Sequence, residues 1–471
     1  RLTYQEVRDD GLEDDYDWQD RFRNRRLDLR VDQYLTNRDL LEMNFGFVQG
    51  ESIRGRLDDG LFPLKVSEGD DPIRRLDESS AWMQLKWTRT LSNDEDMVFR
   101  YVLQEDRGDD SFRYLGKKYN QAGEKGWRQE LEFQHRLSPV TDVRMVWGAG
   151  WRNDKMRSAT MLPDAGRVGR DIWRIFSSAE WRPKPWLTAN LGAAHEHDSL
   201  AGNHFSPRAS LAFHLSQEDT VRLGFARAWR TPSILAFKVN QRDPNIETLV
   251  GNPGLPAERL DSWELAYLGD WRRINMSLDV RHFRERLDDR LMVVRTGPSP
   301  ATPYSEQSIQ DISIRGYEFQ WRWQPLNGTR FLLNHASMRL DSQLSANGRL
   351  IQATPGSNMT NPFDYFELAE KSAPRRSSSI LVSQALPGGF DVSVARYWVD
   401  AIKWTRNTEA DKYQRTDARI GYRFNWRGQK GELAYTQQSV DGAHVEQRDA
   451  GRKPNQRTVD RRHWVSLRLD F

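Results

Sequence analysis

The chain has 471 residues, a formal net charge of +3, 29% charged residues, 18 tryptophans and no cysteine. The missing cysteines exclude a disulfide scaffold, thiolate metal sites and a cysteine nucleophile, and the near-balanced charge gives no broad basic face for nucleic acid. No stretch approaches 18 consecutive apolar residues, which excludes a transmembrane helix but leaves open a barrel, whose strands are apolar only at alternate positions.

The first 21 residues are acidic and contain the run DDGLEDD at positions 9–15. Carboxylates in such a run could hold Ca²⁺, but the run lacks the spacing of an EF-hand loop. A solvated charge run is the expected alternative. The segment also lacks the pattern of a signal peptide, although a secreted or outer-membrane protein needs one.

From residue 22 onward the chain repeats one unit, in which a strand, a tight turn, a second strand and a long polar loop follow each other. Leu27, Leu29 and Val31, for example, alternate with Asp28 and Arg30. Alternation with a period of two places one set of side chains on each face of a strand. About 19 strands, nine tight turns and nine longer loops are predicted in this way.

Tryptophan recurs near strand ends, on the apolar parity. The positions are Trp87, Trp127, Trp151, Trp173, Trp181, Trp263 and Trp323. An aromatic girdle at the lipid–water boundary uses tryptophan in this way. The alternative is that these tryptophans are buried in a soluble core, although such a core seldom has tryptophan at so many strand ends.

The final strand keeps the alternation up to the last residue, with Val465, Leu467, Leu469 and Phe471 on one parity. We expect this set to face lipid, and Ser466, Arg468 and Asp470 to face the lumen. The ending resembles the C-terminal strand of Gram-negative outer-membrane proteins, which the barrel assembly machinery reads. The regular alternation of short and long connections favours an all-β fold, a transmembrane antiparallel up-and-down β-barrel, over a soluble sandwich or propeller.

Four motifs in residues 205–323 follow each other as they do in TonB-dependent outer-membrane receptors. They are FSPRASL at 205–211, AWRTPS at 228–233, GNPGLPAE at 251–258 and RGYE at 315–318. The third departs from the family pattern, because Ala257 stands where proline is commonest before the glutamate. The chain is thus identified as similar to this family over about half its length, and elsewhere the resemblance is architectural.

The resemblance implies a 22-stranded barrel around an N-terminal plug, in the outer membrane of a Gram-negative bacterium. It implies uptake of a scarce extracellular ligand, such as a ferric siderophore, cobalamin or haem, with energy relayed by TonB. We expect residues 1–21 to be the tail of an extracellular loop and residues 22–471 to be the C-terminal part of the barrel. The plug, the segment that contacts TonB and about three strands are expected to lie outside this chain.

Three residues around the loop that follows the second motif are candidate ligand-binding residues, namely Arg230, Asn252 and Glu258. Arg230 could bind an anionic ligand with two donors, or could pair with a lumen carboxylate or the plug, which we favour. Asn252 and Glu258 are expected to shape the return of the loop. His195 and His197 share one face of a strand and could ligate a metal, although two histidines make a weak site.

No enzyme motif occurs in the sequence, and no cofactor is predicted. Besides a receptor, the pattern leaves open a passive porin-like channel, and a barrel enzyme or adhesin. Ligand specificity is expected in the long loops, chiefly residues 230–258 and 340–374, because rigid barrels carry variable recognition on their outer loops.

Overall fold

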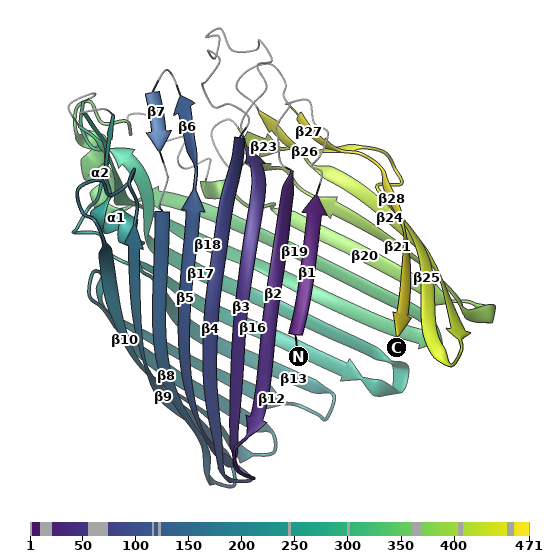
Figure 1. Cartoon of the computed structure of the whole chain (residues 1–471). Coiled ribbons are helices and arrows are strands. Elements are labelled where there is room, and N and C mark those ends of the chain that lie inside the picture. Colours follow the sequence, from purple (N-terminus) through teal and green to yellow (C-terminus); the bar gives the residue numbers. More distant parts are fainter. Residues whose placement is uncertain are drawn as a thin grey trace.

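A computed structural model describes residues 2–9, 21–54, 74–114, 117–120, 124–243, 246–298, 302–359, 369–403, 408–449 and 456–470. One large sheet dominates it (Figure 1). The strands of its wall are β1 (Leu2–Asp9), β2 (Phe22–Tyr34), β3 (Asp39–Arg54), β4 (Arg74–Ser92), β5 (Glu95–Asp109), β8 (Glu124–Val140), β9 (Val143–Arg157), β10 (Val168–Lys184), β11 (Leu187–Asp198), β12 (Gly202–His214), β13 (Asp219–Arg230), β16 (Glu258–Trp271), β17 (Met276–Arg295), β18 (Tyr304–Leu326), β19 (Thr329–Leu344), β20 (Arg376–Ala385), β21 (Phe390–Val399), β24 (Tyr413–Trp426), β25 (Gln429–Gln438) and β28 (Arg462–Asp470).

Smaller elements occupy the connections between these strands. They are β6 (Ser111–Tyr114), β7 (Lys117–Asn120), α1 (Ile234–Lys238), β14 (Asn240–Asp243), β15 (Ile246–Val250), α2 (Ala346–Ala353), β22 (Ile402–Lys403), β23 (Thr408–Ala410), β26 (His444–Asp449), β27 (Gln456–Val459) and the 3-10 turns η1 (Arg272–Ile274) and η2 (Pro387–Gly389). In the part of the chain that the structure describes, no helix is long and apolar enough to cross a membrane.

Every wall strand pairs antiparallel with the wall strand that follows it along the chain, from β1 to β28. The tight turns gather at one end of the sheet and the longer connections at the other (Figure 1). Within the described residues, β1 and β28 pair on one side only and form the two edges of the curled sheet. The predicted up-and-down antiparallel barrel is confirmed.

Residues 2–9 correct one expectation. They are not part of a loop tail, because β1 pairs with β2 along its whole length, from Leu2 opposite Leu29 to Asp9 opposite Phe22. The sequence did not predict this strand because its apolar residues lie on both faces: Leu2 and Tyr4 share one face, whereas Val7 lies on the other. The wall therefore has one strand more than predicted. Residues 10–20, with most of the acidic run, lie outside the described residues.

The two faces of the wall differ in polarity, as the alternation predicts. On β10, Trp173 is 58% exposed and its neighbour Ile175 is also exposed, whereas Arg174 between them donates to Glu132 at 2.5 Å. Trp263 on β16 is 61% exposed and contacts Phe225, with 4.5 Å between ring centroids. Large exposed apolar side chains on one face and ion pairs on the other are the arrangement of a membrane barrel. These exposed tryptophans rule out the soluble-core alternative.

Two small apolar clusters order the outer end of the wall near β17 and β18. The first contains Val294, Ile309, Leu344, Ile351 and Met359 and brings α2 onto the extended strands. The second contains Ala236, Phe237, Leu255 and Leu291 and holds α1. Burial of several such side chains contributes about 1.5–3 kcal/mol each. The outer connections in this region are therefore packed structures.

Candidate ligand-binding lumen

Ion pairs between neighbouring strands line the inner face of the wall. Glu42 on β3 accepts from Arg30 at 2.9 Å and from Lys86 at 2.6 Å. The buried Glu132 on β8 likewise lies between two arginines, Arg100 on β5 and Arg174 on β10. Arg30 also pairs with Asp32, and Arg100 with Glu130, so cations and carboxylates alternate along this face. The lumen is thus polar and suited to a hydrophilic ligand.

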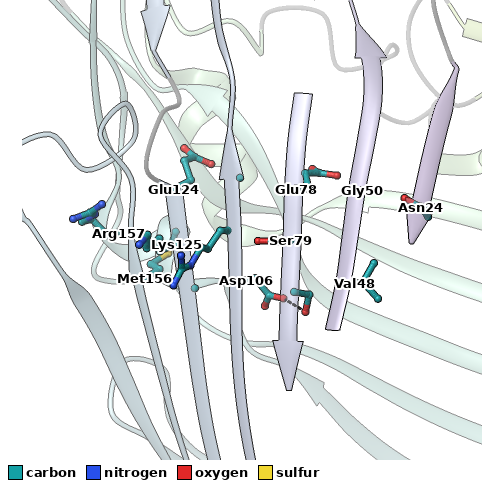
Figure 2. Close-up of a pocket in the computed structure, with 14 residues that line it drawn as sticks. Asn24, Val48, Gly50, Glu78, Ser79, Asp106, Glu124, Lys125, Met156 and Arg157 are labelled. Carbon is teal, nitrogen blue, oxygen red and sulfur yellow. Dashed lines mark hydrogen bonds between the residues drawn. The ribbon is translucent and has the colours of Figure 1, made fainter. Parts of the chain in front are cut away.

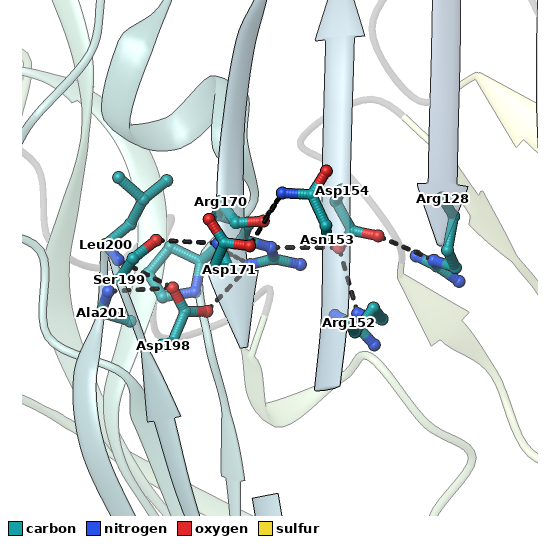
Figure 3. Close-up of polar contacts among 11 residues, drawn as sticks. Arg128, Arg152, Asn153, Asp154, Arg170, Asp171, Asp198, Ser199, Leu200 and Ala201 are labelled. Atoms are coloured by element: carbon teal, nitrogen blue, oxygen red, sulfur yellow. Dashed lines mark hydrogen bonds and ion pairs between the residues drawn. The ribbon is translucent and has the colours of Figure 1, made fainter. Parts of the chain in front are cut away.

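Three arginines converge on the carboxylate of Asp154 near the outer end of β9 (Figure 3). Arg128 on β8 donates to Asp154 at 2.8 Å, and Arg152 and Arg170 each lie 3.2 Å from its second oxygen. These four residues form the Asp154 cluster. Even with Asp198, which Arg170 also contacts, two carboxylates face three guanidinium groups, so the cluster carries excess positive charge.

The Asp154 cluster is anchored to the loop that carries α1. Arg170 also contacts the fully buried Asp198 at 3.3 Å and donates to the carbonyl of Pro232 at 3.0 Å. Asp198 accepts from the backbone N–H groups of Leu200 and Ala201, which closes the short β11–β12 turn. Arg170 therefore has a structural role, while Arg128 and Arg152 retain donors for a ligand. Sequence reasoning missed this cluster, although its arginines fall on the inward parity of their strands.

A groove of about 510 Å³ lies beside this cluster in the wall formed by β2–β5, β8 and β9 (Figure 2). Gly50, Gly108 and Gly126 leave room in its floor. Its inward carboxylates are those of Glu78, Asp106 and Glu124, and Asp106 accepts from Ser80 at 2.6 Å. Arg107, Lys125 and Arg157 also line the groove and balance these carboxylates, so the groove carries no excess positive charge, and the Asp154 cluster is the better candidate for an anion site.

Arg230 pairs with a carboxylate, the role favoured for it, and its partner is Glu258, a pairing that the sequence did not predict. The two residues are directly opposite at the outer ends of β13 and β16 and form a two-point ion pair. Glu258 is only 4% exposed and also accepts from the backbone N–H of Leu291 at 2.7 Å. A role of Arg230 in ligand binding stays a prediction, since two of its donors are already used.

Asn252 shapes its loop through three hydrogen bonds. Its backbone N–H donates to Ala236 at 2.8 Å, its side chain donates to the carbonyl of Glu306 at 3.2 Å, and its side-chain oxygen accepts from Gly254 at 3.0 Å. These bonds fix the return from α1 toward β16. The structural role expected for Asn252 follows from this geometry, while ligand contact stays a prediction.

His195 and His197 lie on the outward face, because they pair with Ile175 and Trp173. One ring nitrogen of His197 lies 3.0 Å from the side-chain oxygen of Asn203. Among the described residues, no group of three or more histidine, aspartate or glutamate side chains is arranged to hold a metal ion. Metal binding by this pair stays a prediction without a third ligand to support it.

The terminal strand β28 continues the outward apolar face. Val465 pairs with Tyr435 and Leu467 with Leu433, and all four side chains are exposed. Leu469 follows on the same parity, whereas Phe471 lies outside the described residues. The predicted orientation of Val465 and Leu467 agrees with this arrangement, and recognition by the assembly machinery stays a prediction.

The chain matches the profile of the family described as "TonB dependent receptor-like, beta-barrel" over residues 3–436. Among curated proteins, no sequence matches significantly. Solved structures with the same fold include a mutant of the ferric enterobactin receptor PfeA from Pseudomonas aeruginosa, with a TM-score of 0.73 at 13% identity, covering 96% of this chain and 69% of that one. The siderophore receptor PirA from Acinetobacter baumannii gives 0.70 at 12% identity, covering 95% and 71%.

The ferric-catecholate import receptor Fiu from E. coli gives a TM-score of 0.70 at 9% identity, covering 99% of this chain and 76% of that chain. At such identities these structures share the fold with the present chain. The family profile spans nearly all wall strands. The chain therefore belongs to the TonB-dependent receptor family, and it forms a receptor barrel of the Gram-negative outer membrane rather than a passive porin.

Proposed function

We propose that this barrel takes up a ferric siderophore, an anionic iron chelate, with energy from TonB. The observation that carries the proposal is the Asp154 cluster, in which three guanidinium groups share one carboxylate on the lumen wall. Arginine binds paired oxygens of an anion through two donors at once, which suits the oxygen-rich surface of such a chelate. The structural neighbours described above are siderophore receptors, which supports the same ligand class.

In this proposal Arg128 and Arg152 contact the ligand, and Arg170 holds the cluster in place. Side-chain exposure supports the division, because Arg128 and Arg152 are more exposed than Arg170. The outer loops, including residues 230–258 and 340–374, select among chelates. We further propose that the assembly machinery reads β28 and that the plug and the TonB-contacting segment accompany this barrel in the intact receptor.

Uptake of ⁵⁵Fe-loaded siderophores by iron-starved cells that express the intact receptor tests the proposal. Arg128→Gln/Arg152→Gln should weaken binding of the accepted chelate roughly tenfold or more, because a hydrogen bond to a charged group contributes about 1.5–3 kcal/mol. Arg272→Gln/Arg273→Gln, in the turn at the opposite end, removes the same charge and should leave uptake unchanged. Uptake that persists in cells without TonB, or that is the same in the Arg128→Gln/Arg152→Gln variant as in the wild type, would overturn the proposal.

A further inference from the structure

Three arginines lie side by side on the outward face of the wall. Arg284 on β17 is directly opposite Arg315 on β18, and Arg315 is directly opposite Arg339 on β19. All three side chains are exposed. In the same lateral row, Arg284 is opposite Trp263, whose indole lies on the outer surface. We call Arg284, Arg315 and Arg339 the arginine row.

Few carboxylates neutralise this row. Arg315 and Arg339 share one, Asp341, at 3.3 and 2.8 Å. Arg284 has no ion pair or side-chain hydrogen bond in the described part of the chain. The next row toward the outer end differs, because Arg227 there has a two-point pair with Asp261 and Arg286 is paired with Asp288 at 2.7 Å. Like charges directly opposite each other destabilise a sheet, so the arginine row calls for anions from outside the chain.

The row lies at a defined depth. Arg284 is the ninth residue of β17 and Arg339 the eleventh of β19, counted from the tight turns. A tilted strand crosses the hydrocarbon layer in roughly 9–11 residues. The exposed Tyr317 pairs with His282 one row below, on the turn side. The arginines therefore lie level with Trp263 and one row outside Tyr317, at the aromatic boundary next to the headgroups of the outer leaflet.

We propose that the arginine row binds the phosphate groups of a phosphorylated glycolipid in the outer leaflet. The complementarity is specific: guanidinium groups bind phosphate oxygens through two donors, and the neighbouring Trp263 and Leu265 give the acyl chains an apolar surface. Both of these side chains are exposed on the same face. The lipid would offset the repulsion between the three arginines and hold this sector of the wall at a fixed depth in the membrane.

The test measures lipid binding to the intact receptor in detergent micelles by native mass spectrometry. The probes are lipid A with two phosphates and the same lipid with both removed. The variant is Arg284→Gln/Arg315→Gln, which leaves Asp341 paired with Arg339. It should weaken binding of the phosphorylated lipid roughly tenfold. Arg272→Gln/Arg273→Gln is the control of equal charge change and should bind as the wild type does.

Three results would overturn the proposal. They are equal affinity of the double variant and the wild type, equal binding of the two lipids, and displacement of the lipid by millimolar inorganic phosphate, which would indicate a site for free anions. Heat-modifiable migration on gels verifies that each variant is folded. If the double variant does not fold, lipid binding to the single variant Arg284→Gln tests the proposal. This substitution breaks no ion pair or hydrogen bond of the Arg284 side chain within the described residues. Unchanged affinity in that variant also overturns the proposal.

Discussion

Arg230 and Glu258 form a two-point ion pair across the outermost rung between β13 and β16, and the carboxylate also accepts the N–H of Leu291 on β17. One buried side chain thus ties together three strands and both ends of the 27-residue connection between β13 and β16, residues 231–257. This rung fixes the base of the loop that contains α1.

Glu258→Ala should destabilise the outer end of this sector. The substitution leaves the N–H of Leu291 without its acceptor, and an unsatisfied buried donor costs about 1–3 kcal/mol. Urea unfolding of the refolded receptor in lipid vesicles measures the change. Asp270→Asn removes one partner of the exposed pair with Arg272 and should cost under about 1 kcal/mol. Equal losses in the two variants would show that the rung has no special role.

Leu191→Arg should impair barrel folding much more than Asn190→Arg. Leu191 is exposed on the outward face in the middle of the span, where arginine costs about 2–4 kcal/mol, whereas Asn190 faces the polar lumen opposite Ser210. Yield of heat-modifiable barrel after refolding compares the two. Similar yields from both would contradict the assignment of faces.

Glu306→Gln should stabilise the receptor at neutral pH. Glu306 lies at the outer end of β18, beyond the span, and burial, with a contribution from Glu258, raises the pKa of its carboxyl. An acid whose pKa is raised on folding loses stability as pH rises through that pKa, because the folded state binds the proton more tightly. Melting temperatures should therefore differ at pH 7.5 and converge as pH falls. A constant difference across this range would refute the linkage.

Gly251→Ala should disturb the loop that carries α1. A Cβ at Gly251 would overlap the carbonyl of Phe237, and backbone atoms cannot yield as a flexible side chain can. Overpacking of this kind costs about 1–3 kcal/mol. Gly254→Ala, in the same loop, meets only the side-chain oxygen of Asn252 at an ordinary contact distance. Limited proteolysis should cut the Gly251 variant faster, and equal rates in both variants would count against this packing.

Exchange of residues 230–258 and 340–374 with the corresponding loops of a siderophore receptor of the same family should change which ligand is taken up. Residues 244–245 of the first segment and 360–368 of the second lie outside the described residues. The exchange should change the ligand because the wall supplies a rigid frame while the outer connections carry recognition. Competition between two ⁵⁵Fe-loaded siderophores measures the change. Unchanged preference after both exchanges would place specificity in the lumen wall.

The sequence by itself determined the class of fold and the orientation of most wall strands. Alternation at Leu27, Leu29 and Val31 is a local property, because neighbouring side chains on a strand must point to opposite faces. The exposed tryptophans were predictable for the same reason. The mixed parity of residues 2–9 gave no such signal, and only the pairing of Leu2 with Leu29 revealed β1.

Contacts between strands were decided by the tertiary structure alone. The three arginines around Asp154 come from three strands, and Arg284, Arg315 and Arg339 come from three others. Whether such residues meet depends on the register between strands, and a shift of one residue would move each of them to the opposite face. Register is set by the turns and by the packing of the whole wall, so no local pattern in the sequence specifies these two clusters.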